Sequence, residues 1–111
     1  MALTFIGAGL LRTPLELETP VLSDDGAGGH ETQWHAVATV MAALEPVSAL
    51  SRFAAAQQLE EVSHRAIIRK RGDVRAGMRF RRGTRSLVIM TVHDPDETGR
   101  YLTCMLREEL P

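Results

Sequence analysis

The sequence predicts a mainly β fold: a small closed antiparallel β-barrel of about six strands, with one short α-helix inserted between the second and third strands. Five segments carry the period-two apolar pattern of half-buried strands, a sixth is a near-continuous apolar run, and turn residues separate most of them. Strands joined by short turns form antiparallel sheets, and small antiparallel sheets remove their exposed edges by closing. The pattern therefore favours one barrel domain over residues 14–111.

The middle of the chain reads strand, helix, strand. Apolar residues fall two apart in residues 34–44 and again in residues 62–68, as half-buried strands require. Between them, Pro46 blocks ladder hydrogen bonding and Ser48 can cap a helix. A run of three alanines then makes helix the favoured local conformation. We therefore expect a helical insertion at about residues 48–59.

The N-terminal third is expected to hold an arm, a strand and a loop. Residues 1–13 are small and apolar and read as an N-terminal arm, which either docks on a neighbour or stays a disordered tail. Alternation in residues 15–19 predicts a short edge strand, and Trp34 is predicted to contribute most to the core. Residues 23–31 read as a flexible acidic loop. The loop residues of interest are Asp24, Asp25, Gly26, Gly28 and Gly29.

The C-terminal half is expected to supply the remaining strands. In residues 78–80, apolar residues alternate with arginine. Residues 87–92 form a near-continuous apolar run, and in residues 101–108 the apolar residues again fall two apart. Glycine and aspartate turns separate the three segments, which suits hairpin connections.

Composition excludes several classes of protein. The 111 residues suffice for one domain, and the net charge of −1 leaves no global electrostatic footprint for nucleic acid or membrane. A single cysteine, Cys104, permits neither an internal disulfide nor a zinc site built from several thiols. The apolar N-terminal run is too short to span a bilayer, so we expect a soluble protein assembled inside the cell, with no membrane partner.

Catalytic motifs are absent from the sequence. The four histidines lack metal-ligand spacing, and no phosphate-binding glycine motif occurs. His64 reads as a partly buried strand residue, and the Asp24–Asp25 pair lacks the alternating oxygen ligands of a calcium loop. We therefore expect neither an enzyme nor a cofactor or metal site.

Charge is distributed unevenly along the chain. Eight of the 13 basic residues lie between Arg69 and Arg85, against one acid, Asp73. This basic tract suits a protein interface, a solvated strand face, or contact with a phosphate backbone. The last possibility keeps a small β-barrel DNA-binding adaptor, gripping DNA through its arginine-rich edge, as the alternative function.

Pieces along nearly the whole chain match, in order, the sequences of one known family. They are residues 9–12, Trp34 with 37–40, 43–48, 52–58 with 62–65, 74–79 and 102–108. On these pieces the chain resembles the small head–tail joining proteins of long-tailed bacteriophages, also called head-closure or stopper proteins, and their relatives in gene transfer agents. The glycine-rich loop at residues 23–31 stands where family members more often carry a short turn.

The resemblance implies a virion structural protein in the neck of a phage-like particle, assembled in the bacterial cytoplasm. Such proteins form a homo-oligomeric ring, here a hexamer or a dodecamer, below the portal and its adaptor ring. The ring closes the DNA-filled head, offers a docking surface to tail terminator or tail tube proteins, and lets double-stranded DNA pass on ejection.

Two groups of residues take roles under this resemblance. The connection between the second and third strands is expected to face the channel or a neighbouring subunit, and the basic tract to contact other subunits or the adaptor. The residues of the connection are Gln57, Gln58, Glu60 and Glu61. Those of the basic tract are Arg69, Lys70, Arg71, Arg75, Arg79, Arg81 and Arg82.

Overall fold

The computed structural model describes residues 8–24, 26–47, 62–95 and 97–109, and it confirms a mainly β fold of six antiparallel strands. A short 3-10 helix at Ala8–Leu10 precedes them. The strands are β1 (Thr13–Asp24), β2 (His30–Pro46), β3 (His64–Arg69), β4 (Arg79–Arg82), β5 (Arg85–His93) and β6 (Tyr101–Glu109). The helix predicted at about 48–59 lies outside the described residues, and the described ranges contain no α-helix. None of their helices is long and apolar enough to cross a membrane.

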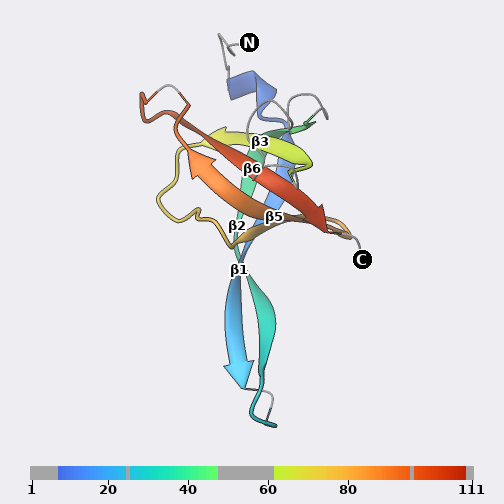
Figure 1. The fold of residues 1–111 in the computed structure, drawn as a ribbon. Helices are drawn as coiled ribbons and strands as arrows, with labels where there is room; N and C mark the ends of the chain where they lie inside the picture. The colour runs from blue at the N-terminus through green and yellow to red at the C-terminus, as the bar shows by residue number, and fades with distance from the viewer. Residues whose placement is uncertain (1–7, 25, 48–61, 96, 110–111) are drawn as a thin grey trace.

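The six strands form one ring-like sheet. Their order is β1-β2-β3-β6-β5-β4, and β4 pairs back with β1, so the sheet closes on itself (Figure 1). All neighbours are antiparallel. The seam between β1 and β4 is the shortest, with three paired residues on each strand.

The interior of the closed sheet is filled by side chains. Phe80, Leu15 and Leu17 are fully buried there, so the period-two pattern of the first strand places its leucines inward, as predicted. In β6, one of the two alternating sets of side chains faces inward and is buried. That set is Leu102, Cys104 and Leu106. The closed sheet is therefore a packed core and not a pore.

Strands β1 and β2 run on beyond the closed sheet as a two-stranded hairpin. β1 pairs with β4 only at residues 16–18, and β2 pairs with β3 only from Ala42 onwards. Residues 19–35, named here the hairpin extension, pair only with each other and project from the rest of the molecule (Figure 1). The molecule is consequently elongated, with extents of 51 × 29 × 25 Å.

The hairpin extension corrects two predicted boundaries. The strand expected over residues 15–19 is 12 residues long, and the loop expected over residues 23–31 shrinks to a turn between Asp24 and His30. Pairing reaches the tip because Gly26 and Gly28 adopt positive φ angles of 82° and 86°, which a tight turn needs. Asp24 also ends its strand by accepting a hydrogen bond from the Gly26 N–H at 2.9 Å. Asp24 is thus a paired strand residue at the end of β1.

A bulge marks the point where the hairpin leaves the closed sheet. Leu17 pairs with Ala38, but the next residue, Glu18, pairs with Ala36, so Val37 is an extra residue in β2. Bulges bend and twist a strand locally. Here the bulge separates the part of β2 that covers the core from the part that projects.

Trp34 is not a core residue, contrary to the prediction. It pairs with Pro20 on the hairpin extension and is only partly buried, whereas Phe80 is the largest fully buried side chain. The alternation in residues 34–44 predicts a strand that is half-buried along its whole length. Only the part of β2 from Ala38 onwards covers the core, because the sheet ends where β1 leaves β4.

Two leucines of β1 provide a matched test of this boundary. Leu17 is fully buried in the closed sheet, whereas Leu22 on the hairpin extension is 67% exposed. We expect Leu17→Ala to lower the free energy of unfolding by about 2–5 kcal/mol, because it leaves a cavity in the core. Leu22→Ala should change it by less than about 0.5 kcal/mol. Urea unfolding of the two variants measures both, and equal losses would contradict the assigned boundary.

Candidate interaction surfaces

The seam between β1 and β4 is held by a buried charge cluster. Leu17 pairs with Phe80 on the inner face, while Glu18 pairs with Arg79 on the outer face. Glu18 is only 5% exposed, yet its carboxylate accepts hydrogen bonds from Arg79 Nε at 2.7 Å and Arg81 Nε at 2.9 Å. Two guanidinium groups thus satisfy both oxygens of one buried carboxylate.

The electrostatics of Glu18 follow from this geometry. Burial by itself would raise the pKa of its carboxyl group. The hydrogen bonds and positive charges of Arg79 and Arg81 outweigh that cost and hold the pKa below its usual value of 4.5. Glu18 is therefore ionised at neutral pH and joins two strands that meet over very few residues.

Arg79 also connects the seam to the hairpin extension. Its guanidinium carbon lies 4.2 Å from the centroid of the Trp34 ring, in a cation–π arrangement. Between β1 and β2, the Thr39 hydroxyl donates a hydrogen bond to the Glu16 carboxylate at 2.7 Å. A two-stranded hairpin alone is marginally stable in water. The Glu18–Arg79–Trp34 contacts therefore anchor the base of the extension to the closed sheet.

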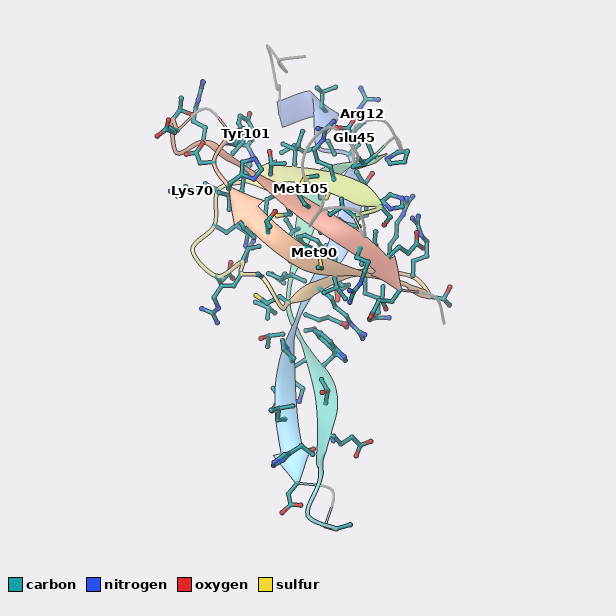
Figure 2. All side chains as sticks on the ribbon, in the orientation of Figure 1. Arg12, Glu45, Lys70, Met90, Tyr101 and Met105 are labelled. Atoms are coloured by element: carbon teal, nitrogen blue, oxygen red, sulfur yellow. The ribbon has the colours of Figure 1, made fainter. Side chains whose placement is uncertain are left out.

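The basic tract divides into two groups once contacts are considered. Arg79 and Arg81 bind Glu18, Arg71 forms a two-bond ion pair with Asp73 at 2.9 Å, and Arg85 binds Glu108 at 2.9 Å. The remaining members are exposed and make no ion pair with any described residue. They are Arg69, Lys70, Arg75 and Arg82. Figure 2 shows Lys70 on one flank of the closed sheet, well away from the hairpin tip.

This division weakens the case for an arginine edge that grips DNA. Three of the seven predicted contact residues already have carboxylate partners within the chain. Phosphate contacts need cations whose charge is available to the backbone of the nucleic acid. Reversing the charges of Arg79 and Arg81 would also remove both hydrogen-bond donors of the buried Glu18 carboxylate, so such a variant would perturb the fold itself.

A second polar cluster lies where the chain returns from residues 48–61. Ser63 Oγ accepts the Glu108 N–H at 2.8 Å and lies 2.9 Å from His64 Nδ1. Arg85 binds the Glu108 carboxylate at 2.9 Å and lies 3.4 Å from His64 Nε2. Burial lowers the pKa of His64, outweighing the attraction of Glu108.

This cluster is structural and not a hydrolytic triad. In a triad, one ring nitrogen of histidine serves the nucleophile and the other serves the carboxylate. Here Nδ1 of His64 faces both Ser63 and Glu108, and Nε2 faces a guanidinium group. The cluster ties Ser63 to β6, in keeping with the predicted structural role of His64.

The predicted channel-facing residues, Gln57, Gln58, Glu60 and Glu61, lie outside the described residues. The two ends of their connection are described and lie together. The Val47 N–H donates to the Ser63 carbonyl at 2.9 Å, and the Ser63 N–H donates to the Leu106 carbonyl at 2.8 Å. The connection therefore leaves and rejoins the closed sheet at one place.

A surface cleft of about 340 Å³ opens where β2 parts from β3. Residues 39–41 of β2 pair with β1 on one side and with no described strand on the other. The cleft combines apolar and basic walls. Its lining residues are Leu11, Thr39, Val40, Met41, Arg69 and Arg71. A second cleft of about 350 Å³ lies beside the 3-10 helix.

Reactive and metal-binding chemistry find no support in the described ranges. No three His, Cys, Asp or Glu residues there are placed to hold a metal ion. Cys104 is buried, and burial raises the pKa of its thiol to about 12, so the thiolate nucleophile is scarce.

The comparisons with known proteins identify the family. The family model of phage head completion proteins matches residues 6–109. A chain from the virion of a native gene transfer agent particle is 32% identical, with a TM-score of 0.69, over 90% of this chain and 96% of that chain. Protein SF1141 from Shigella flexneri 2a, solved in solution, is 26% identical, with a TM-score of 0.74, over 93% of this chain and 96% of that chain. No curated protein matches.

This chain belongs to the phage head completion protein family. It is therefore a virion structural component and not an enzyme. The resemblance to head-closure proteins and to a gene transfer agent relative, drawn above from the sequence, is confirmed.

Sequence reasoning missed the Glu18 cluster, although a signal for it was present. Glu16 and Glu18 are two residues apart on one strand, and so are Arg79 and Arg81 on another. Complementary charges at the same period on two strands indicate direct cross-strand pairing. The Glu18 pairing joins β1 to β4 across 61 residues of sequence, so a local reading does not reveal it.

Replacing Glu18 with glutamine tests the cluster. A carboxyl group whose pKa is lower in the folded than in the unfolded state stabilises the fold above its unfolded pKa. That contribution is lost as the pH falls through the folded pKa. We expect Glu18→Gln to cost about 1–3 kcal/mol of unfolding free energy at pH 7, and less as the pH falls below 4.5.

The control is Glu16→Gln, on the same strand and outer face. Urea unfolding across pH 3–7 compares both variants with the unmodified protein. Asp73 and Glu108 also have lowered pKa values, from hydrogen bonds with Arg71 and Arg85, so all three proteins lose stability in acid. Only Glu18→Gln should lose less unfolding free energy than the unmodified protein as the pH falls. If its stability falls with pH in parallel with that of the other two proteins, the role given to Glu18 is ruled out.

Proposed function

We propose that this protein forms a ring in the neck of a phage-like particle, closes the DNA-filled head and presents the surface on which the tail docks. Above it lies the portal with its adaptor ring, and below it lie tail terminator or tail tube proteins. The observation that carries the proposal is the head completion family match over residues 6–109. The 32% identical chain in a gene transfer agent virion supports the same setting.

The packed interior supports a ring of several copies. Fully buried side chains such as Phe80 and Leu15 fill the closed sheet, so DNA cannot pass through a single copy. A channel for double-stranded DNA must then lie between copies. Repeated contacts of one kind close into a ring when the rotation per copy closes. Hexamer and dodecamer are the ring sizes proposed.

The free cations of the basic tract suit the contacts of such a ring. Arg69, Lys70, Arg75 and Arg82 are exposed and lack ion-pair partners among the described residues. Charged groups on a rim steer association and set its register more than they raise affinity. Their proposed partners are acidic surfaces of a neighbouring copy or of the adaptor ring.

The connection between β2 and β3 is proposed to face the channel. Its ends meet at Val47 and Ser63, so it forms one excursion from the closed sheet. Its residues Gln57, Gln58, Glu60 and Glu61 are neutral or acidic. A surface of this kind gives a phosphate backbone few points of tight attachment and lets DNA slide.

Electron microscopy of particles from cells lacking the gene tests the function. We expect heads that are filled or leaking DNA, without tails, together with free tails. Supplying the gene from a plasmid should restore tailed particles. Complete tailed particles in the absence of the gene would contradict a neck function, and the free cations would then need testing as a DNA-binding surface by salt-dependent binding.

Charge reversal separates assembly from folding. We expect the double variant Arg75→Glu/Arg82→Glu to lower the amount of protein in purified heads at least tenfold, because like charges then face each other across the contact. The urea midpoint should change little, since both side chains are exposed and form no ion pair with a described residue, and Arg75 makes only the smallest contribution to the lowered pKa of Asp73. The control, Arg75→Lys/Arg82→Lys, keeps the charge and should be incorporated normally. Normal incorporation of the glutamate variant would exclude these residues from the contact.

A further inference from the structure

We propose that the hairpin extension of one copy docks into the β2–β3 cleft of the next copy, so that the ring is built by hairpin exchange between neighbours. This inference rests on the proposed ring and specifies the contact that builds it. The occupant of the cleft is a second copy of this chain.

The hairpin extension has the composition of a docking element. Val21 and Leu22 are 39% and 67% exposed on it, and Val37 at its base is 41% exposed. Val21 and Leu22 are consecutive in the strand and point to opposite faces of the hairpin, so Leu22 is the exposed apolar residue of the face that also carries Asp24. Residues 19–35 also contain three acids and no lysine or arginine. The projecting element is thus apolar and acidic.

The cleft has the complementary composition. Leu11, Val40 and Met41 give it an apolar wall, and Met41 is 46% exposed there. Arg69 stands at its edge and forms no ion pair with a described residue, and Arg71 lies beside it. Arg71 is paired with Asp73, so Arg69 is the cleft cation whose charge is available to an acidic partner. An apolar cleft with a basic edge matches an apolar hairpin with acidic residues.

The backbone offers a further point of attachment. Residues 39–41 of β2 have a strand partner on one side only, within the part of the chain that is described. An unpaired strand edge is a template for a strand from another chain. The outer edge of β1 beyond Glu18 likewise has no described partner and projects on the extension. In the proposed contact, Leu22 lies against Met41, and Asp24 lies near Arg69.

The contact cannot form within one copy. Met41 pairs with Pro14, which lies eight residues before Leu22 on the same extended strand. At about 3.3 Å per residue, Leu22 and Met41 are therefore about 26 Å apart. The extension itself is about 20 Å long from Glu18 to Asp24 on the same basis. That length reaches across most of a neighbour whose shorter extents are 29 and 25 Å.

Hairpin exchange also provides a contact that can repeat around a ring. A projection on one surface and a receiving cleft on another form a heterologous contact, which repeats from copy to copy. Each copy then gives one hairpin and receives one. The acidic extension and the basic tract sit on different parts of one chain, so the net charge of −1 conceals a strong internal asymmetry.

Disulfide trapping in assembled particles tests the contact. The variant Leu22→Cys/Met41→Cys is produced in place of the natural protein, and purified particles are oxidised and run on a non-reducing gel. The natural Cys104 is fully buried and does not compete. A disulfide needs Cα atoms within about 7 Å, so any bond between the two new cysteines joins different copies. We expect a ladder of multimers up to the ring size, which collapses to monomer on reduction.

A second pair serves as the control. Leu22→Cys/Thr98→Cys keeps the hairpin cysteine and moves the other to the exposed turn between β5 and β6, outside the cleft. It should stay monomeric on the gel. A charge exchange adds an independent readout: Asp24→Arg should lower incorporation into heads, and adding Arg69→Asp to it should restore incorporation.

The outcomes separate this inference from the function on which it rests. A ladder specific to the Leu22/Met41 pair supports hairpin exchange. Three results overturn hairpin exchange if the variant is incorporated into particles: no ladder forms, the control pair gives the same ladder, or the new cysteines bond to a different virion protein. Each of them leaves the neck function standing. If the unmodified protein is absent from purified particles, the neck function fails, and hairpin exchange fails with it.

Discussion

The closure of the sheet depends on the seam between β1 and β4. Only three residues of each strand pair there, and β4 has only four residues. Leu17 and Phe80 fill the inner face of the seam, and Glu18 binds Arg79 and Arg81 on the outer face. Few backbone hydrogen bonds are available at this point, so the seam relies on a buried aromatic ring and a carboxylate whose two oxygens are both satisfied.

The same seam determines the shape of the molecule. Because β4 is short, β1 loses its second neighbour after Glu18 and continues only with β2. Arg79 binds Glu18 and stacks on Trp34, so one side chain couples closure of the sheet to the base of the projecting hairpin. The short β4 thus leaves β1 and β2 to project, and the short β3, which ends at Arg69, leaves the cleft where β2 parts from it. The surfaces proposed for assembly therefore arise from unequal strand lengths.

Individual residues show which features of the structure the sequence could predict. The inward leucines of β1 and the set Leu102, Cys104 and Leu106 were predictable, because alternation is a local property of a strand. The predicted core position of Trp34 is wrong, because alternation does not reveal whether the inner face of a strand packs against the rest of the sheet. The basic tract is visible in the sequence, but its division into paired and unpaired cations depends on Asp73, Glu18 and Glu108, of which Glu18 and Glu108 lie outside the tract. The family was also recognisable, since its matching pieces run in order along the chain.

The sequence by itself determined the antiparallel β class, the direction of the core side chains and the uneven distribution of charge. These follow from periodicity and composition, which are read over a few neighbouring residues. Only the tertiary structure decided that β4 returns to β1, that the hairpin projects, and which arginines remain free. Each of these depends on the pairing of strands far apart in the chain, as with Glu18 and Arg79 at a separation of 61 residues. Register between distant strands is selected by the packing of the whole core, so no local pattern specifies it.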